Sequence, residues 1–236
     1  MTAHLLIMYP HPKDVKEFER AYREEHLPYA GPRLKGATNV ATKRVVGPAF
    51  TLRFVPARED LATPASWASP ISTRTAIEAM EEGVIAVADA NGVADAGIFG
   101  DILCARMAYR KVGALITDGV MRDMEGVLAT GLAVWCAGAA APASVAGLTF
   151  INWQEPIGCG GVAIFPGDTI VADGDGAVVI PQAMLAEVTE LAAEQEIQEG
   201  WIIGEVHKGV PLPGLYPPNE ETKARYAAWR KENKKA

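Results

Sequence analysis

An arginine and two carboxylates follow an apolar run near the middle of the chain. Residues 113–126 read GALITDGVMRDMEG: residues 114–117 suit a buried strand, and Asp118, Arg122 and Asp123 come after it. Charges placed there cost desolvation energy unless they pair with one another or hold a ligand. Arg122 offers a planar fork for a carboxylate, and Asp123 offers a hard oxygen ligand for Mg²⁺. The alternative interpretation is a surface ion pair between the two, which is common and energetically minor.

A second candidate cluster lies upstream, in the segment FGDILCAR, where Gly100 and Asp101 open a predicted helix. The first N–H groups of a helix have no partner inside the helix, so they form a site for anions. A simple helix cap is the alternative role for Asp101. Both clusters lie where a strand gives way to a loop or helix, the usual location of sites in α/β folds. Together they predict a pocket for a 2-oxo carboxylate and a divalent metal ion.

The apolar pattern predicts the elements that position these clusters. Continuous apolar runs indicate buried strands, and apolar residues three or four apart indicate helices. The predicted strands cover 84–90, 114–117 and 132–138, and the predicted helices cover 101–113, 124–131 and 181–209. This alternation predicts an α/β fold. The Pro-, Ala- and Ser-rich segment 56–72 is long enough to be a binding loop.

Composition limits the partners of the chain. Its 236 residues include 49% hydrophobic and 22% charged residues, which is typical of a soluble globular enzyme. The formal charge of −7 argues against binding to nucleic acid or to an anionic membrane, but allows a small anionic substrate. Three widely separated cysteines argue against a disulfide framework. With no signal-peptide pattern and no long apolar segment, the sequence predicts a cytoplasmic protein.

Three ordered blocks carry a family resemblance: VVGPAFTLRF, GDILCARMAYRKVGALITDGVMRD and EPIGCGGVAIFPGDTIVADGDGAVVIP. They resemble the family that includes the regulator of ribonuclease activity A and the 4-hydroxy-4-methyl-2-oxoglutarate/4-carboxy-4-hydroxy-2-oxoadipate aldolases. The resemblance implies a layered α-β-β-α sandwich over 45–209, followed by an arm and helix over 210–236. Residues 1–44 resemble the opening of an EthD-type ferredoxin-like domain, which implies a short β-α-β appendage.

The resemblance also implies roles for the two clusters. The family's substrate-binding arginine falls on Arg122, and its metal-associated aspartate falls on Asp123. The implied cofactor is Mg²⁺, Mn²⁺ or another divalent cation. Asp101 takes the place of an acid that positions or activates water. The loop that holds the pyruvate carboxylate in the family falls on Gly100, Asp101, Ile102 and Leu103.

Three further acids bear on the metal shell. In the aldolases a glutamate from the C-terminal helix of a neighbouring subunit reaches the metal, and Glu196 and Glu199 are both candidates here. This implies a homo-oligomer of three or six chains. The aldolase motif also carries an acid three positions after the aspartate of its Arg-Asp pair, which corresponds to position 126 here. In this chain the acid is Glu125, one residue earlier. On a helix, its side chain would point about 100° away from the direction of the motif acid. Asp123 is therefore the part of the metal shell that carries over.

The predicted function is a class II, metal-dependent pyruvate aldolase-like lyase that cleaves a 4-hydroxy-2-oxo acid and also decarboxylates oxaloacetate. One alternative is a non-catalytic interaction protein, because the family includes such a regulator; that branch lacks the Arg-Asp pair, which favours the enzyme. Another is a lyase or dehydratase of sugar-derived 2-oxo acids at the same site. We also expect the apolar arm 211–218 to pack on an adjacent subunit, the alternative being an arm folded on its own chain.

Overall fold

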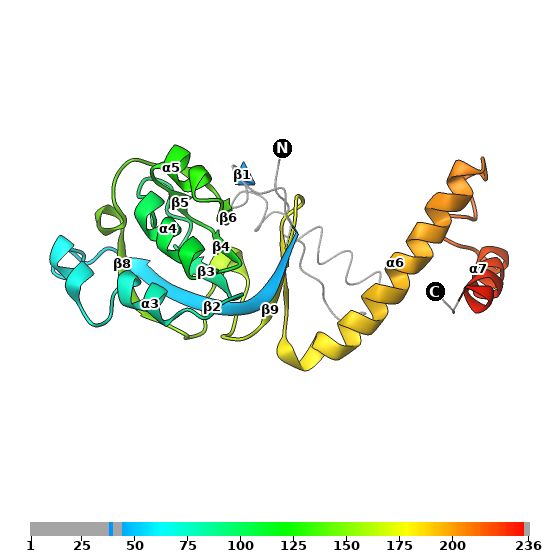
Figure 1. Cartoon of the computed structure of the whole chain (residues 1–236), viewed down its shortest axis with the longest axis horizontal. Coiled ribbons are helices and arrows are strands. Elements are labelled where there is room, and N and C mark those ends of the chain that lie inside the picture. The colour runs from blue at the N-terminus through cyan, green and yellow to red at the C-terminus, as the bar shows by residue number, and fades with distance from the viewer. Residues whose placement is uncertain (1–37, 40–43, 234–236) are drawn as a thin grey trace. The chain divides into compact units, whose positions relative to one another are not determined.

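The computed structural model describes residues 38–39 and 44–233 (Figure 1). The predicted N-terminal appendage, residues 1–44, lies almost entirely outside these residues. The chain forms two compact units, residues 1–182 (unit 1) and 183–236 (unit 2). This boundary falls just before the observed helix of residues 185–207, and the predicted domain bounds of 45–209 and 210–236 stay a prediction. Within the described ranges, no helix is long and apolar enough to cross a membrane.

Unit 1 is built on an eight-stranded sheet in the order β1-β6-β4-β3-β2-β9-β10, with β8 also pairing with β2. Strands β2, β3, β4 and β6 run parallel to one another, while β1, β8, β9 and β10 pair antiparallel with their neighbours. The strands are β1 (Thr38–Asn39), β2 (Val45–Pro56), β3 (Ile85–Asp89), β4 (Ala114–Thr117), β6 (Ala133–Cys136), β8 (Leu148–Trp153), β9 (Thr169–Ala172) and β10 (Ala177–Ile180). A separate parallel pair consists of β5 (Val120–Met121) and β7 (Gly138–Ala139).

The long strand β2 curls the sheet (Figure 1). Its first residues, 45–48, pair with β9, and residues 49–53 pair with β3. A register shift between Arg53 and Phe54 bends its pairing with β8. One strand therefore belongs to both the parallel centre and the antiparallel end.

Side chains alternate between the two faces of the central strands, as the two-residue period of a strand requires. In β3, Ala86 and Ala88 belong to one buried cluster, and Ile85 and Val87 belong to another. The first cluster packs under the helices α3 (Thr73–Ala79), α4 (Asp101–Tyr109) and α5 (Met124–Ala129). The second packs against β9 and β10. The mixed α/β fold predicted from the sequence is confirmed.

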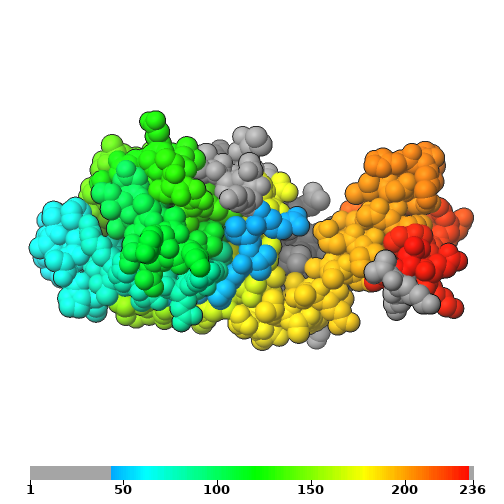
Figure 2. Space-filling view, viewed as in Figure 1, coloured from blue at the N-terminus to red at the C-terminus, as the bar shows by residue number. Residues whose placement is uncertain are grey.

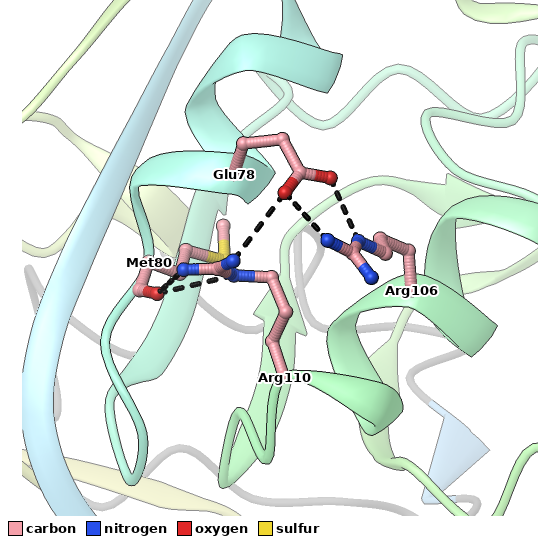
Figure 3. Close-up of polar contacts among 4 residues, drawn as sticks. All are labelled: Glu78, Met80, Arg106 and Arg110. Atoms are coloured by element: carbon pink, nitrogen blue, oxygen red, sulfur yellow. Dashed lines mark hydrogen bonds and ion pairs between the residues drawn. The ribbon is translucent and has the colours of Figure 1, made fainter.

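Helices α3 and α4 are joined by a charged clamp (Figure 3). Arg106 on α4 donates two hydrogen bonds of 2.7 Å to the Glu78 carboxylate on α3. Arg110 donates to the same carboxylate at 3.3 Å and to the Met80 carbonyl at 2.6 Å. The hydrogen-bonded Arg106 guanidinium lowers the pKa of Glu78 below its ordinary value. The clamp fixes the spacing of two helices that both contribute to the pocket described below.

Unit 2 contains α6 (Leu185–His207) and α7 (Glu220–Glu232). The prediction that the arm 211–218 packs on an adjacent subunit is wrong for Leu215, which is 2% exposed and packs on its own unit. The turn that precedes α7 brings this side chain to the nearest apolar surface of the same chain. Leu212 and Tyr216 remain exposed, so their packing stays a prediction. The buried cluster consists of Trp201, Ile202, Leu215 and Tyr226.

Candidate active site

The two charged clusters found in the sequence come together at the entrances to α4 and α5. The Ile98 N–H donates to the Val120 carbonyl at 2.9 Å, and the Arg122 N–H donates to the Phe99 carbonyl at 2.9 Å. The loop before α4 therefore runs alongside the loop before α5. Main-chain hydrogen bonds, independent of any side-chain charge, position the cluster residues.

Glycine at position 100 allows the close approach of these loops. Gly100 is the N-cap of α4. A Cβ atom there would lie 2.5 Å from Oδ2 of Asp123 and 3.0 Å from Nε of Arg122. The Arg122–Asp123 pair consequently lies directly against the N-terminus of α4, where the helix leaves its first N–H groups without internal acceptors.

Arg122 and Asp123 form an ion pair, with 2.8 Å between Nε and Oδ2. Their side chains are 38% and 43% exposed. Asp123 has φ 53° and ψ 42°, the left-handed region that aspartate enters more readily than most residues. Its side chain caps no N–H group of α5, and turns instead to the arginine. The surface ion pair considered from the sequence thus exists, but it lies in the wall of a cavity.

This cavity has a volume of about 180 Å³. It contains every residue that the sequence predicted for substrate binding, namely Gly100, Asp101, Ile102, Leu103 and Arg122, together with Asp123. Thr73, from α3, and Ser144, from the 3-10 turn Ser144–Ala146, also line it. We call this cavity the acid pocket.

Sequence reasoning missed two large side chains of the acid pocket, Trp67 and Arg74. The Arg74 guanidinium lies 4.9 Å from the centre of the Trp67 ring, a cation–π contact. Trp67 belongs to the segment 56–72, whose length was the available signal. Figure 2 shows this segment at the surface at one end of unit 1. Arg74 gave no signal, because a single arginine on a short helix resembles any solvated charge.

Asp101 is the first residue of α4, and its side chain lies against α5. Its Oδ1 accepts a hydrogen bond of 2.7 Å from the Ile102 N–H. A Cβ atom at Gly126 would lie 2.7 Å from Oδ2 of Asp101, so the first turn of α5 lies against this carboxylate. Position 126 is where the aldolase motif places its additional acid. Glu125, the acid shifted by one residue, is exposed and does not line the acid pocket.

Asp118, the other acid of the same segment, has a structural position outside the acid pocket. Its carboxylate accepts main-chain hydrogen bonds from Ala90 at 2.7 Å and from Gly92 and Gly160 at 3.2 Å. Burial raises the pKa of Asp118 above its ordinary value, while these N–H groups act in the opposite direction. Asp118 holds three loops together.

Glu196 and Glu199 lie on α6 in unit 2. Glu199 accepts a hydrogen bond of 2.9 Å from Gln195, and Glu196 is exposed. Their contribution to the pocket of a neighbouring subunit stays a prediction.

The donor set of the acid pocket fits a magnesium-type ion. No group of three or more His, Cys, Asp or Glu side chains in the described part of the chain forms a ready-made metal site. Mg²⁺, however, is usually held by one or two carboxylates and completed by water and substrate oxygens. Arg122 occupies Oδ2 of Asp123 and leaves Oδ1 of this exposed carboxylate for a cation. Asp123 therefore suits an ion that is bound jointly by protein and substrate.

Sequence comparisons identify related proteins. The family model RraA-like: Aldolase/RraA matches residues 25–179. A Halalkalibacterium halodurans protein, provisionally named 4-hydroxy-4-methyl-2-oxoglutarate aldolase, is 32% identical over 178 residues, covering 70% of this chain and 77% of that protein. Protein DlpA of Legionella pneumophila is 31% identical over 145 residues, covering 61% of this chain; the match spans only 23% of DlpA.

Solved structures agree with these matches. Streptomyces coelicolor RraAS2, described as an unusual member of the RNase ES inhibitor RraA protein family, has a TM-score of 0.61 and 33% identity. The alignment covers 82% of this chain and 98% of RraAS2. An uncharacterized Pseudomonas syringae protein has a TM-score of 0.65 over 87% of this chain and all of its own, at 23% identity, which shows the shared fold alone. The chain belongs to the Aldolase/RraA family.

Proposed function

We propose that the chain is a divalent-metal-dependent lyase that cleaves a 4-hydroxy-2-oxo acid by a retro-aldol reaction and releases pyruvate. Decarboxylation of oxaloacetate would use the same site, because both reactions leave negative charge on a pyruvate enolate. The observation that carries this proposal is the position of Arg122 and Asp123 against the N-terminus of α4 in one pocket. The provisional aldolase name of the Halalkalibacterium halodurans relative supports it.

The acid pocket is suited to the carboxylate of a 2-oxo acid. The N–H groups of Asp101 and Leu103 lie in the first turn of α4, where the helix supplies no acceptor and its dipole favours an anion. Arg122 adds a planar donor fork. Arg74 adds a second positive charge to the wall and has no carboxylate partner among the described residues. The substrate carboxylate can therefore replace Asp123 as the partner of Arg122.

Asp123 would hold the metal ion, Mg²⁺ or Mn²⁺, with Glu196 or Glu199 of a neighbouring copy completing the shell. When bound, such an ion supplies positive charge beside the 2-oxo group. This arrangement requires a homo-oligomer, for which the family resemblance implies three or six chains, and light scattering on the full chain measures this number directly. A monomer with full activity would contradict the shared site.

The protein's own groups can carry out the remaining chemistry. A water positioned by Asp101 takes the proton of the C4 hydroxyl, and C4 becomes a carbonyl. As the C3–C4 bond breaks, its electron pair becomes the C2=C3 bond of the enolate, and the negative charge passes to the C2 oxygen. Arg122 donates N–H groups to the oxygens on which this charge develops. The same water returns the proton to C3, which gives the methyl group of pyruvate.

A non-catalytic interaction protein is the second candidate, favoured by the likeness to RraAS2. The Arg122–Asp123 pair in a cavity supports the enzyme instead, since an interaction surface has no need of it. A lyase or dehydratase of sugar-derived 2-oxo acids would use the same residues and differ in its products.

A product assay tests the proposal. Pyruvate release is measured from a panel of 4-hydroxy-2-oxo acids and from oxaloacetate, with Mg²⁺ and with EDTA. We expect turnover with Mg²⁺ and its loss with EDTA. Dehydrated products from sugar-derived 2-oxo acids would favour the dehydratase. No product from any substrate, with an intact fold and added Mg²⁺ or Mn²⁺, would favour the interaction protein.

A further inference from the structure

A second cavity, of about 270 Å³, adjoins the acid pocket. It lies between the segment 61–73 and the segment 144–151, which includes the start of β8. The two cavities share Trp67, Thr73 and Ser144 in their walls. The two cavities are therefore neighbours, separated by no more than these shared side chains, and we call the second cavity the side chamber.

The walls of the two cavities differ in charge. The acid pocket carries two arginines and two aspartates, whereas the side chamber is lined by no charged residue. Two of its hydroxyl groups are already hydrogen-bonded: Ser66 Oγ donates to the Thr63 carbonyl at 2.6 Å, and Ser72 Oγ accepts from the Thr75 N–H at 3.3 Å. Ser69 and Thr149 accept main-chain hydrogen bonds from Ile71 at 3.2 Å and from Arg58 at 2.9 Å, and Thr73 and Ser144 are the other two hydroxyl residues of the wall. The remaining lining residues are apolar.

Several large apolar side chains of this wall are exposed, although aliphatic side chains of this size are usually buried. Leu61 is 44% exposed, Ile71 50% and Ile151 37%. Exposed apolar groups gathered around one cavity are typical of a binding site rather than of an ordinary surface.

Building on the proposed function, we propose that the side chamber receives the part of the substrate beyond C4, and that this part is uncharged and apolar. A carboxylate entering the chamber would lose hydration without meeting a cation. Arg74 does not supply one, because it lines only the acid pocket, where its guanidinium stacks on Trp67. The two arginines therefore serve the 2-oxo acid end, and the chamber selects an alkyl or aryl end.

Binding of matched 2-oxo acids tests this selection without depending on turnover. Calorimetry on the full chain with Mg²⁺ compares 2-oxopentanoate with 2-oxoglutarate, which has the same carbon number but a second carboxylate. We expect 2-oxopentanoate to bind about tenfold more tightly. Lengthening the apolar end to 2-oxohexanoate should strengthen binding about fourfold, as expected for one buried methylene.

A charge placed in the chamber should reverse the preference. The side chain of Ile71 is half exposed, so Ile71→Arg should leave the fold intact while supplying the missing cation. We expect this variant to prefer 2-oxoglutarate by about tenfold, with pyruvate binding unchanged. Leu128→Arg is the matched control, because Leu128 is 52% exposed on α5 and lines neither cavity.

The contrary outcomes are distinct. Tighter binding of 2-oxoglutarate by the unaltered chain would overturn the apolar chamber, and loss of that preference in Arg74→Gln would assign the second carboxylate to Arg74. Equal binding of 2-oxo acids of every length, with no effect of Ile71→Arg, would also overturn the role of the side chamber, while the proposed function would stand. A chain that binds not even pyruvate would fail the proposed function, and the chamber's role with it.

Discussion

Two aspartates five positions apart, Asp118 and Asp123, lie on either side of β5 and have opposite surroundings. Asp118 accepts three main-chain hydrogen bonds and lies outside the acid pocket. Asp123 is 43% exposed, adopts a left-handed backbone, and contacts Arg122. The pKa of Asp118 is raised by burial.

The difference concerns which partners can be exchanged. Main-chain N–H groups cannot leave Asp118 without moving the loops that carry them, so this carboxylate is fixed. An exposed ion pair contributes little free energy. Arg122 and Asp123 can therefore release each other for a ligand at small cost. The acid that can bind a ligand is therefore the one whose hydrogen-bond partner can be exchanged, and its neighbours in the sequence do not identify it.

The largest expected effect follows from replacing the guanidinium of Arg122, one partner of the exchangeable ion pair. Arg122→Lys should lower kcat/KM about 100- to 1000-fold, because an ammonium cannot reproduce a bidentate guanidinium beside developing charge. Steady-state pyruvate release measures this loss, and Tm should be unchanged. The control is Arg58→Lys, an exposed arginine paired with Asp60 outside the acid pocket. Unchanged kinetic constants in Arg122→Lys would remove the arginine from the site.

Displacing the pair without changing its charge should have a smaller effect. In Gly100→Ala the added Cβ would lie 2.5 Å from Oδ2 of Asp123, so the side chains must shift. We expect kcat/KM to fall about 10- to 100-fold, as misplacement of catalytic groups by about 1 Å can do. Gly204→Ala is the control, since a Cβ there meets nothing within 4 Å. Equal activity of both variants would show that the close approach at Gly100 has no catalytic consequence.

Substitution of Asp118, the carboxylate with fixed main-chain partners, should lower the stability of the fold. Asp118→Asn removes one acceptor and turns an NH₂ group toward main-chain donors, which should cost about 2 kcal/mol of unfolding free energy. Denaturant unfolding measures this loss, and the exposed residue Asp175, changed to Asn, is the control.

The pH dependence of the same variant gives a second check. Because the folded pKa of Asp118 is raised, its contribution to stability falls as pH rises from the ordinary carboxyl pKa of about 4 to the raised value. The asparagine does not titrate, so the stability difference between parent and variant should be larger below this window than above it. A difference that grows with pH would contradict the burial of the carboxylate.

The smallest effect is expected at the α3–α4 clamp. The pKa of Glu78 is lowered, so its contribution is present above the ordinary glutamate pKa and is lost as pH falls. Glu78→Gln should lower Tm slightly at neutral pH, and the difference should vanish in acid. Glu81→Gln is the control, because Glu81 has no ion pair in the described part of the chain. An equal change in Tm for both variants would show that the clamp contributes nothing.

The sequence predicted those parts of the molecule that depend on local pattern. Continuous apolar runs located β3, β4 and β6, and Gly100 and Asp101 marked the start of α4. Because each cluster preceded a helix at a strand end, their meeting in one pocket could also be expected.

Features that depend on distant partners could not be predicted. Asp118 is structural because of N–H groups 28 and 42 positions away, at Ala90 and Gly160. Arg74 belongs to the acid pocket because the segment before α3 folds Trp67 beneath it. Leu215 packs on its own unit because the turn before α7 returns it to α6. In each case the decisive contact is set by the fold and not by the residue's local sequence.

The most direct test of the account is Asp123→Asn. Asparagine tolerates the left-handed backbone at this position, so the variant removes the charge while preserving the loop. Pyruvate release is measured across a Mg²⁺ titration for the parent, for Asp123→Asn and for the exposed control Glu125→Gln. We expect a saturable Mg²⁺ dependence in the parent and the control, and at least about 100-fold lower turnover in Asp123→Asn at an unchanged Tm. Turnover and metal dependence of Asp123→Asn within a few-fold of the parent would contradict Asp123 as the metal-holding acid.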